Sequence, residues 1–275
     1  SVIYFELKDI AKSISYLQQA ANLNLPIAQY NFGKMLYEGI IIPQDINRAI
    51  FNLTLAAKNN YIDAQFLLGM IYYVSPYIPK DITRSIYYLT LAANQNNPEA
   101  QYNLSLIYYE GKVIQRDISK AIYYASLASN QYYADSSFLL GTFFFSSKYV
   151  KHDLSKAIHY FQLAANKNHK AAIFNLGVIY SKTEYSNQKK AIHYFTLAAK
   201  QKHPKAQYII SLYCLEGVFF QRNVNVAIDL LKSSFSNGFV LSGFALGFLY
   251  HEGKYIKRDI ELSIKYYKDA SSINN

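Results

Sequence analysis

Histidine and cysteine are the side chains in this sequence best suited to metal binding or nucleophilic chemistry. Six histidines are present, and two pairs occupy equivalent places in neighbouring segments: His159 with His193, and His169 with His203. If a fold brought each pair together, the two imidazoles could bind one metal ion. However, KAIHYFQLAANKNHKAA and KAIHYFTLAAKQKHPKA are near copies of each other, so duplication alone explains both pairs. A metal centre also needs carboxylate or thiolate ligands that converge, which this spacing does not offer, and we predict no metal site.

Cys214 is the only cysteine, which excludes an internal disulfide and a zinc site built from cysteines. Equivalent places in the pattern described below hold leucine, tyrosine or phenylalanine, so we predict that Cys214 is a buried core side chain. The sequence contains no phosphate-binding loop, dinucleotide fingerprint or nucleophile elbow. We therefore predict a protein that is not an enzyme and uses no cofactor.

The elements that carry these residues repeat along the chain, mostly every 36 residues. DITRSIYYLTLAA begins at Asp81, and DISKAIYYASLAS begins at Asp117. Eight such segments open with Asp or Asn and continue with isoleucine five residues later; they begin at Asp9, Asp45, Asp81, Asp117, Asp153, Asn187, Asn223 and Asp259. Because Asp and Asn side chains accept backbone hydrogen bonds at helix starts, we predict that each segment is an N-capped helix, here called helix B.

A second element, here called helix A, lies between successive B segments. The stretch PEAQYNLSLIYYEG opens with Pro98 after Asn97 and ends at Gly111, which are typical helix start and stop signals. Seven copies align on a small residue, namely Gly33, Gly69, Ser105, Gly141, Gly177, Ser211 and Gly247. Glycine inside a helix costs about 1 kcal/mol relative to alanine, so its return predicts a neighbouring helix packed closely against it.

The residues AQYNLSLIYYEGK, followed by DISKAIYY from Asp117, resemble the repeat unit of the Sel-one-like repeat family, which is related to the tetratricopeptide repeat. The resemblance covers the whole chain. It implies an all-α fold: a right-handed superhelical solenoid of about seven antiparallel A/B hairpins plus one unpaired B helix. The pattern departs from the family where Ser75, Ser147 and Thr183 replace the loop glycine, and where Asn187 and Asn223 replace the cap aspartate. At those loops we expect a less tight turn.

Basic residues recur at two places beside the cap. The position three residues after the cap holds Arg48, Arg84, Lys120, Lys156 and Lys190 among others, and pairing with the cap aspartate is its simplest explanation. The position just before the cap gives a candidate basic stripe of Lys80, Arg116, His152, Arg222 and Arg258. This stripe is either a solvated face or a docking surface for an acidic partner, which the formal net charge of +10 would attract. Nucleic acid is a weaker alternative, because no regular pattern of base-reading side chains accompanies it.

The variable face of helix A is the predicted partner surface. Repeat proteins keep their stacking contacts constant and vary the surface that recognises partners. The candidate residues are Asn31, Lys34, Leu67, Met70, Asn103, Leu106, Leu139, Thr142, Asn175 and Val178, here called the helix A stripe. Alternating leucines and asparagines suit an extended peptide, with apolar pockets for its side chains and amides for its backbone. The alternative is that some of these positions belong to the core.

The family's known relatives act as adaptors, so the resemblance implies a non-enzymatic scaffold that binds a protein or peptide along the concave helix A surface. Partners implied in this way are a ubiquitin-ligase or membrane-protein quality-control complex, a chitin-synthase activation system, or a signalling assembly. One alternative is a regulatory repeat arm of a larger enzyme such as a kinase, and another is a structural protein that docks on an acidic surface through the basic stripe. Salt dependence of binding would distinguish the last alternative from the groove.

The longest apolar run, FLLGTFFF, is far shorter than the roughly 20 residues that span a bilayer. The single cysteine and the lack of a cleavable leader favour an intracellular, cytoplasmic protein. We expect residues 1–275 to form one repeat domain, and the absence of an initial Met suggests part of a longer chain.

Overall fold

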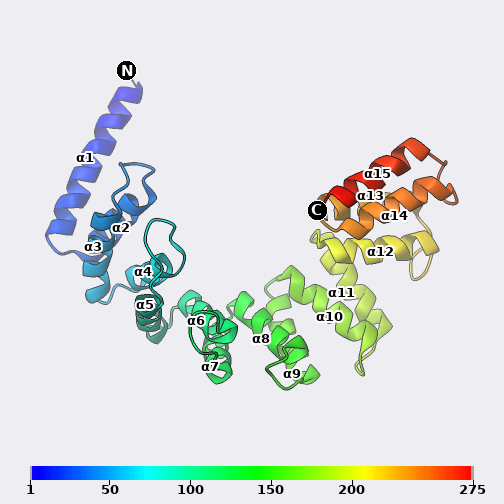
Figure 1. Ribbon diagram of the computed structural model, residues 1–275, viewed down its shortest axis with the longest axis horizontal. Coiled ribbons are helices and arrows are strands. Elements are labelled where there is room, and N and C mark those ends of the chain that lie inside the picture. Colours follow the sequence, from blue (N-terminus) through cyan, green and yellow to red (C-terminus); the bar gives the residue numbers. More distant parts are fainter. Residues whose placement is uncertain (1, 274–275) are drawn as a thin grey trace. The chain divides into compact units, whose positions relative to one another are not determined.

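The computed structural model describes the backbone of residues 2–273 and the side chains of residues 9–273 (Figure 1). Within the described part the chain is entirely helical, with 15 helices and no strand. The helices are α1 (Val2–Asn22), α2 (Pro26–Glu38), α3 (Ile46–Lys58), α4 (Ile62–Val74), α5 (Ile82–Asn94), α6 (Pro98–Glu110), α7 (Ile118–Asn130), α8 (Ala134–Ser146), α9 (Leu154–Ala165), α10 (Lys170–Lys182), α11 (Gln188–Lys200), α12 (Pro204–Glu216), α13 (Val224–Ser236), α14 (Val240–Glu252) and α15 (Ile260–Ser272). Even-numbered helices are the predicted A helices, and odd-numbered helices are the B helices.

Two compact units divide the chain, Ser1–Ser136 and Ser137–Asn275. In the first unit, α2 packs on α3, α4 on α5 and α6 on α7, while α1 lies against α2. In the second unit, α10 packs on α11, α12 on α13 and α14 on α15, and the Phe138 ring of α8 contacts Phe161 of α9. Each B helix within a unit also contacts the A helix that follows it. These contacts confirm the predicted all-α solenoid of seven A/B hairpins plus one further B helix.

Side-chain caps fix the start of seven B helices. The Asp45 carboxylate accepts a hydrogen bond from the Arg48 backbone N–H at 2.9 Å, and Asn187 caps α11 in the same way at 3.0 Å. Asp9 was predicted to be an eighth cap, and this prediction is wrong because α1 already begins at Val2. The residues before Asp9 include no proline or glycine, so nothing in the sequence stops the helix from extending past it.

The A helices end in two ways. Gly111 and three equivalent glycines end their helices in the left-handed conformation, for example at φ +61°. Ser75 and Thr183 instead have extended backbone, with φ −62° and −112°. A side chain disfavours the left-handed region that glycine adopts there, so these two helices end in a different backbone conformation. The less tight turn expected at the loops stays a prediction.

Glycines inside the A helices mark the closest helix contacts. A Cβ atom on Gly69 would lie 2.6 Å from Cγ of Leu89, and one on Gly141 would lie 2.5 Å from Cδ1 of Phe161. Leu89 and Phe161 are both fully buried on the partner B helix. The A and B helices of one hairpin therefore approach each other more closely than an alanine at the glycine position would allow.

Stacked aromatic rings join the two helices of most hairpins. Tyr72 of α4 and Tyr88 of α5 lie 6.0 Å apart with ring planes 7° from parallel. Equivalent pairs stack in four further hairpins: Tyr108 with Tyr124, Phe144 with Tyr160, Tyr180 with Tyr194, and Tyr250 with Tyr266. The high tyrosine content thus serves the hairpin, and burial raises the pKa of the Tyr88 hydroxyl.

Cys214 lies in the core of the second unit and is 7% exposed. Its side chain belongs to the apolar cluster that also contains Ile210 and Leu231. Burial raises the pKa of its thiol, which keeps it in the protonated form. The prediction of a core cysteine is confirmed.

No helix over the described residues is both long and apolar enough to cross a bilayer.

Candidate binding surface

The predicted helix A stripe lies on α2, α4 and α6 in the first unit and on α8 and α10 in the second. Asn31 and Lys34 are exposed, and the other eight side chains are half-buried. No member is fully buried, so every one reaches the surface. Their role in partner binding stays a prediction.

Several members of the stripe already have partners within the fold. Asn103 donates to the Glu99 carbonyl at 2.8 Å, and the Thr142 hydroxyl donates to the Phe138 carbonyl at 3.0 Å. Lys34 pairs with Glu38 at 3.8 Å. Leu67, Met70 and Val178 pack against buried clusters of their own units, so part of their apolar surface belongs to the core.

The same face of helix A is present on α12 and α14, but the predicted helix A stripe did not include these two helices. The equivalent positions are Ile209 and Leu212 on α12, and Ala245 and Phe248 on α14. Phe248 is 58% exposed. Counting from Asn175 and Val178 by the interval of 34 residues that separates Gly177 from Ser211, and then by 36 residues, would have identified all four positions.

A pocket of about 390 Å³ lies between α12 and α14 on this face. Its lining residues are Tyr208, Leu212, Leu215, Glu216, Leu241, Phe244, Ala245, Phe248, Leu249 and Tyr255. Glu216 is the only charged residue among them. An apolar pocket of this size, with few polar groups, is suited to hold a bulky apolar side chain rather than to carry out a reaction.

The candidate basic stripe lies where each A-to-B loop returns beside the C-terminal end of helix A. Arg116 donates from its guanidinium to the carbonyls of Tyr109 and Glu110, both at 2.8 Å, and Arg222 reaches the Glu216 carbonyl at 3.5 Å. A cation at a helix C-terminus is favourable because the carbonyl ends of the peptide dipoles point toward it. The two arginines therefore stabilise helix ends, a role that the sequence analysis did not foresee.

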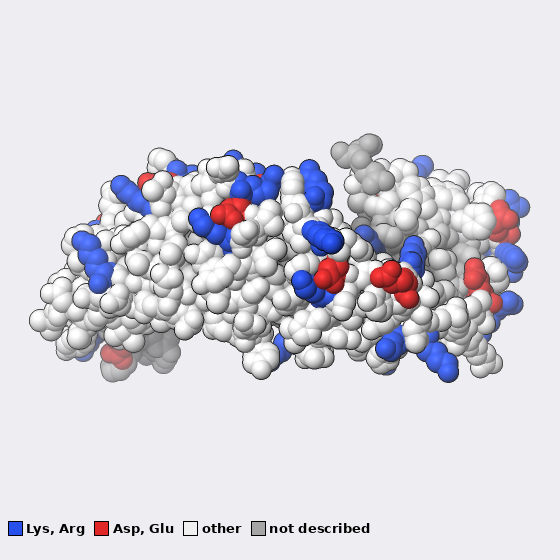
Figure 2. All heavy atoms as spheres, turned by 90° about the horizontal axis from the view of Figure 1, so that it is seen from below, with Lys and Arg blue, Asp and Glu red and all other residues white. Residues whose placement is uncertain are grey.

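The other members of the stripe are also exposed, and two of them contact rings. The Lys80 ammonium lies 4.0 Å from the Tyr73 ring centroid, and His152 lies 6.3 Å from the Phe145 ring. Arg258 packs its backbone and Cβ beside Gly253. On the face shown in Figure 2, Lys and Arg stand mostly apart from one another across a largely uncharged surface. Docking through this stripe stays a prediction.

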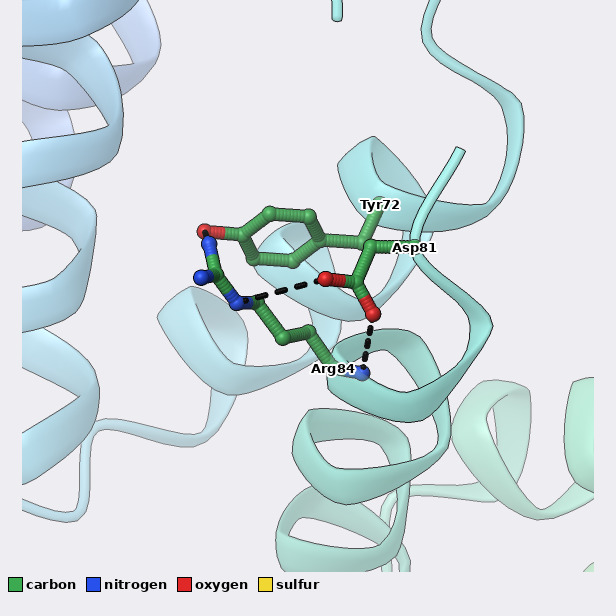
Figure 3. Close-up of polar contacts among 3 residues, drawn as sticks. All are labelled: Tyr72, Asp81 and Arg84. Carbon is green, nitrogen blue, oxygen red and sulfur yellow. Dashed lines mark hydrogen bonds and ion pairs between the residues drawn. The ribbon is translucent and has the colours of Figure 1, made fainter. Parts of the chain in front are cut away.

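Side chains at the second basic position, three residues after the cap, make intramolecular contacts (Figure 3). Arg84 pairs with the Asp81 carboxylate at 3.3 Å, and its guanidinium donates to the Tyr72 hydroxyl at 3.4 Å. This hydrogen bond is the main cause of a raised Arg84 pKa. Lys120 and Lys156 pair with their own cap aspartates at 3.7 and 3.6 Å. The predicted pairing with the cap is confirmed at these three positions.

One of the two histidine pairs caps helices, and the other is exposed. His169 and His203 cap α10 and α12, and in each the Nδ1 atom accepts a backbone hydrogen bond, at 3.2 and 3.4 Å. The His203 ring stacks on Phe174 with centroids 4.3 Å apart. His159 and His193 are exposed on the B helices. In the portion of the chain with described side chains, no three His, Cys, Asp or Glu residues converge as a metal site would require.

Stacked A/B helix hairpins with glycine-mediated contacts define an α-solenoid of the tetratricopeptide-like class. The sequence pattern of the Sel1 repeat matches residues 5–25, 26–61, 62–97, 98–133, 134–169, 170–203, 204–239 and 244–275. The chain therefore belongs to the Sel1 repeat family. Proteins of this family are generally scaffolds for protein interactions and are typically not enzymes.

Solved structures of similar fold include c5321, a protective antigen present in uropathogenic Escherichia coli strains, with a TM-score of 0.86 and 21% identity over 94% of this chain. The match spans 56% of the c5321 chain. A Sel1 repeat protein from Oxalobacter formigenes has a TM-score of 0.75 and 25% identity over 98% of this chain and 80% of its own. Immunity protein PA5088 from Pseudomonas aeruginosa has a TM-score of 0.50 and 16% identity over 78% of this chain and 81% of its own. Among curated protein sequences, none matches this chain.

Proposed function

We propose that this chain is a non-enzymatic adaptor that binds a protein or peptide through the A-helix face, with the pocket between α12 and α14 as the anchor site. The pocket carries the proposal. Leu241 and Phe248 line it while remaining 53% and 58% exposed, so a partner side chain can contact both without unfolding the hairpin. Burying such exposed apolar area contributes roughly 25 cal/mol per Å².

A partner segment suited to this face carries at least one bulky apolar side chain. Such a residue would fill the pocket, where it would contact Phe244 and Leu212, and a few anchors of this kind dominate most interfaces. Within the same unit, the half-buried Asn175 of the helix A stripe, on α10, would contact a more polar part of the partner. The family's general role in protein interaction supports this assignment.

The test introduces charged side chains into the pocket at positions outside the core and measures the effect on peptide affinity. Peptides selected from a random displayed library on the wild-type chain would be measured against a Leu241→Glu/Phe248→Glu variant. We expect their affinity to fall by about tenfold to a hundredfold, because a buried carboxylate would face an apolar anchor.

The matched control is Tyr87→Glu/Tyr123→Glu, which places the same two charges at side chains that are each 58% exposed on α5 and α7. Far-UV circular dichroism should show equal helix content in both variants. Selected peptides that bind both double variants as tightly as the wild type would refute the pocket as the anchor site.

A further inference from the structure

The net positive charge of the protein is confined to one unit. Residues 1–136 contain 10 Lys and Arg against 10 Asp and Glu, whereas residues 137–275 contain 18 against 8. The excess of +10 therefore belongs entirely to the second unit. A surface that concentrates this charge is a candidate for docking an acidic partner.

Five lysines lie on or beside the two turns that join α9 to α10 and α11 to α12. One of them, Lys167, already takes part in a contact within the fold, which leaves four. They are Lys170, Lys200, Lys202 and Lys205, here called the lysine edge, and all four are exposed. The two turns are neighbours, because the ring of His203 in the second turn stacks on Phe174 of α10 at 4.3 Å. Burial lowers the pKa of His203, and the charges of Lys170 and Lys205 lower it further, so both ammonium groups act on this one imidazole.

The stretch of sequence that carries the lysine edge is poor in acidic residues. The sequence between Asp153 and Glu216 contains a single carboxylate, Glu184, which lies after α10 at the other end of that helix. Within the region whose side chains are described, no ion pair involves any lysine of the edge. This distinguishes the lysine edge from Lys120 and Lys156, whose charges are paired with cap aspartates.

Local structure disfavours lysine at three of these four places. Lys202 adopts the left-handed conformation at φ +59°, a region that side chains other than Asn and Asp seldom occupy. The equivalent turn position holds Asn24, Asn60, Asn96, Tyr132, Asn168 and Gly238 in the other repeats.

Lys170 and Lys205 lie in the first turns of α10 and α12, where the helix dipole opposes positive charge. In the first unit, Asp63 and Glu99 occupy the place equivalent to Lys205, where a negative charge is favourable. The folding of the chain therefore does not explain why lysine stands at these positions, whereas binding of an anion would.

We propose that the lysine edge is a docking surface for an Asp- and Glu-rich segment of a partner protein. Carboxylates spaced along an extended segment can contact ammonium groups on both turns. Single-stranded nucleic acid fits less well because it needs open aromatic faces for base stacking. The only aromatic side chains of the two turns are His169 and His203, which cap helices and stack on Phe138 and Phe174.

The lysine edge lies at the turns and not on the apolar A-helix face, so this inference stands independently of the proposed function. Its test compares two variants with the same change in net charge. The edge variant is Lys170→Ala/Lys202→Asn/Lys205→Glu. The control is Lys151→Ala/Lys182→Ala/Lys189→Glu, which alters exposed lysines at or beside the opposite ends of α9, α10 and α11.

Three fluorescent probes would be titrated at low and at physiological salt: a short peptide of alternating Glu and Ser, the same peptide with Gln for Glu, and a thymidylate oligomer of equal length. We expect the Glu peptide to bind the wild type and the control variant alike. The edge variant should bind it about tenfold more weakly, with a shallower salt dependence.

The edge variant should also melt at a higher temperature than the wild type, since Asn suits the left-handed turn and Glu suits the helix start. Lost binding then cannot be attributed to unfolding. Equal losses in the two variants, or equal binding of the Gln peptide, would overturn the proposal. Tighter binding of the thymidylate oligomer that depends on the same lysines would overturn it in favour of a nucleic-acid partner.

Discussion

A hydrogen bond between two glutamine side chains links the A and B helices in two hairpins and is missing in two others. The Gln95 amide donates to the Gln65 side-chain carbonyl at 2.8 Å, and Gln131 makes the same bond to Gln101 at 2.9 Å. Where the B helix ends in Asn instead, the shorter side chain turns back: Asn59 donates to Leu55 of its own helix. The buried Oε1 atom of the equivalent A-helix glutamine, Gln29, then has no partner.

The second incomplete pair shows the same cause. Asn237 bonds to the Ser233 carbonyl of its own helix at 2.7 Å, and the Oε1 atom of Gln207 is buried without a partner. Gln29 and Gln207 are 0% and 4% exposed, so water does not readily replace the missing donor. A single missing methylene group in the side chain thus leaves a buried acceptor unsatisfied.

We predict that Asn59→Gln raises the free energy of unfolding by about 1 kcal/mol, since it supplies the missing hydrogen bond to Gln29. For a chain of this size that corresponds to an increase of roughly 2–4 °C in Tm. The reverse change, Gln95→Asn, should lower stability by about 1–2 kcal/mol because it leaves Gln65 unsatisfied. Urea denaturation followed by far-UV circular dichroism would measure both.

The helix-end preference of Gln over Asn is the competing explanation, and a double-mutant cycle removes it. In a Gln29→Leu background the acceptor is absent, so the gain from Asn59→Gln should disappear. Asn130→Gln, at the exposed end of α7, provides a second control and should change stability little. A gain that persists in the Gln29→Leu background would show that the proposed hydrogen bond is not its source.

Three further perturbations test other parts of the structure. The His203 pKa is lowered from 6.5 to about 4 by burial and then by Lys170 and Lys205, so its contribution is complete above pH 6.5 and is lost as pH falls toward 4; His203→Asn, which keeps a cap, should flatten that decline in Tm. Gly69→Ala should destabilise by about 1–3 kcal/mol, and Leu89→Ala in the same chain should relieve part of the clash, as thermal melts would show. Asp117→Ala should cost about 1 kcal/mol through loss of the α7 cap, whereas Asp117→Asn should retain most of it in the same melts.

The repeat pattern of the sequence predicted the fold because each repeat contains its own signals for helix start, helix end and helix packing. A cap such as Asp81 and a terminator such as Gly111 set helix bounds to within a residue. Gly141 identified a close helix contact, because glycine within a helix costs stability that close packing against a neighbouring helix can offset. The start of α1 was missed because Asp9 matches the cap pattern, while only the residues before it show that the helix continues.

Candidate surfaces were harder to predict, since the exposure of a side chain depends on the residues of adjacent repeats that pack against it. Leu67 and Phe248 hold equivalent faces of helix A; the first packs partly into the core, and the second is 58% exposed beside the pocket. The partner of Arg116 was also hidden, because it consists of backbone carbonyls and not of a side chain. A sequence pattern shows the position of a cation but not which backbone carbonyls at a helix end lack a hydrogen-bond donor within the helix.

The two ends of the hairpins show why a count of basic residues does not locate a binding surface. At the A-to-B loops, local contacts account for the positions of Arg84 and Arg116. Arg84 contacts a carboxylate and a tyrosine hydroxyl, and Arg116 donates to a carbonyl at a helix C-terminus. At the B-to-A turns of the second unit, local structure disfavours lysine. The left-handed backbone disfavours Lys202, and the dipole of α12 disfavours the charge of Lys205. Positive charge that local structure explains gives no separate reason to expect a partner, whereas positive charge that local structure opposes gives one. For this reason our proposal places the acidic ligand at the lysine edge and not at the more regular basic stripe.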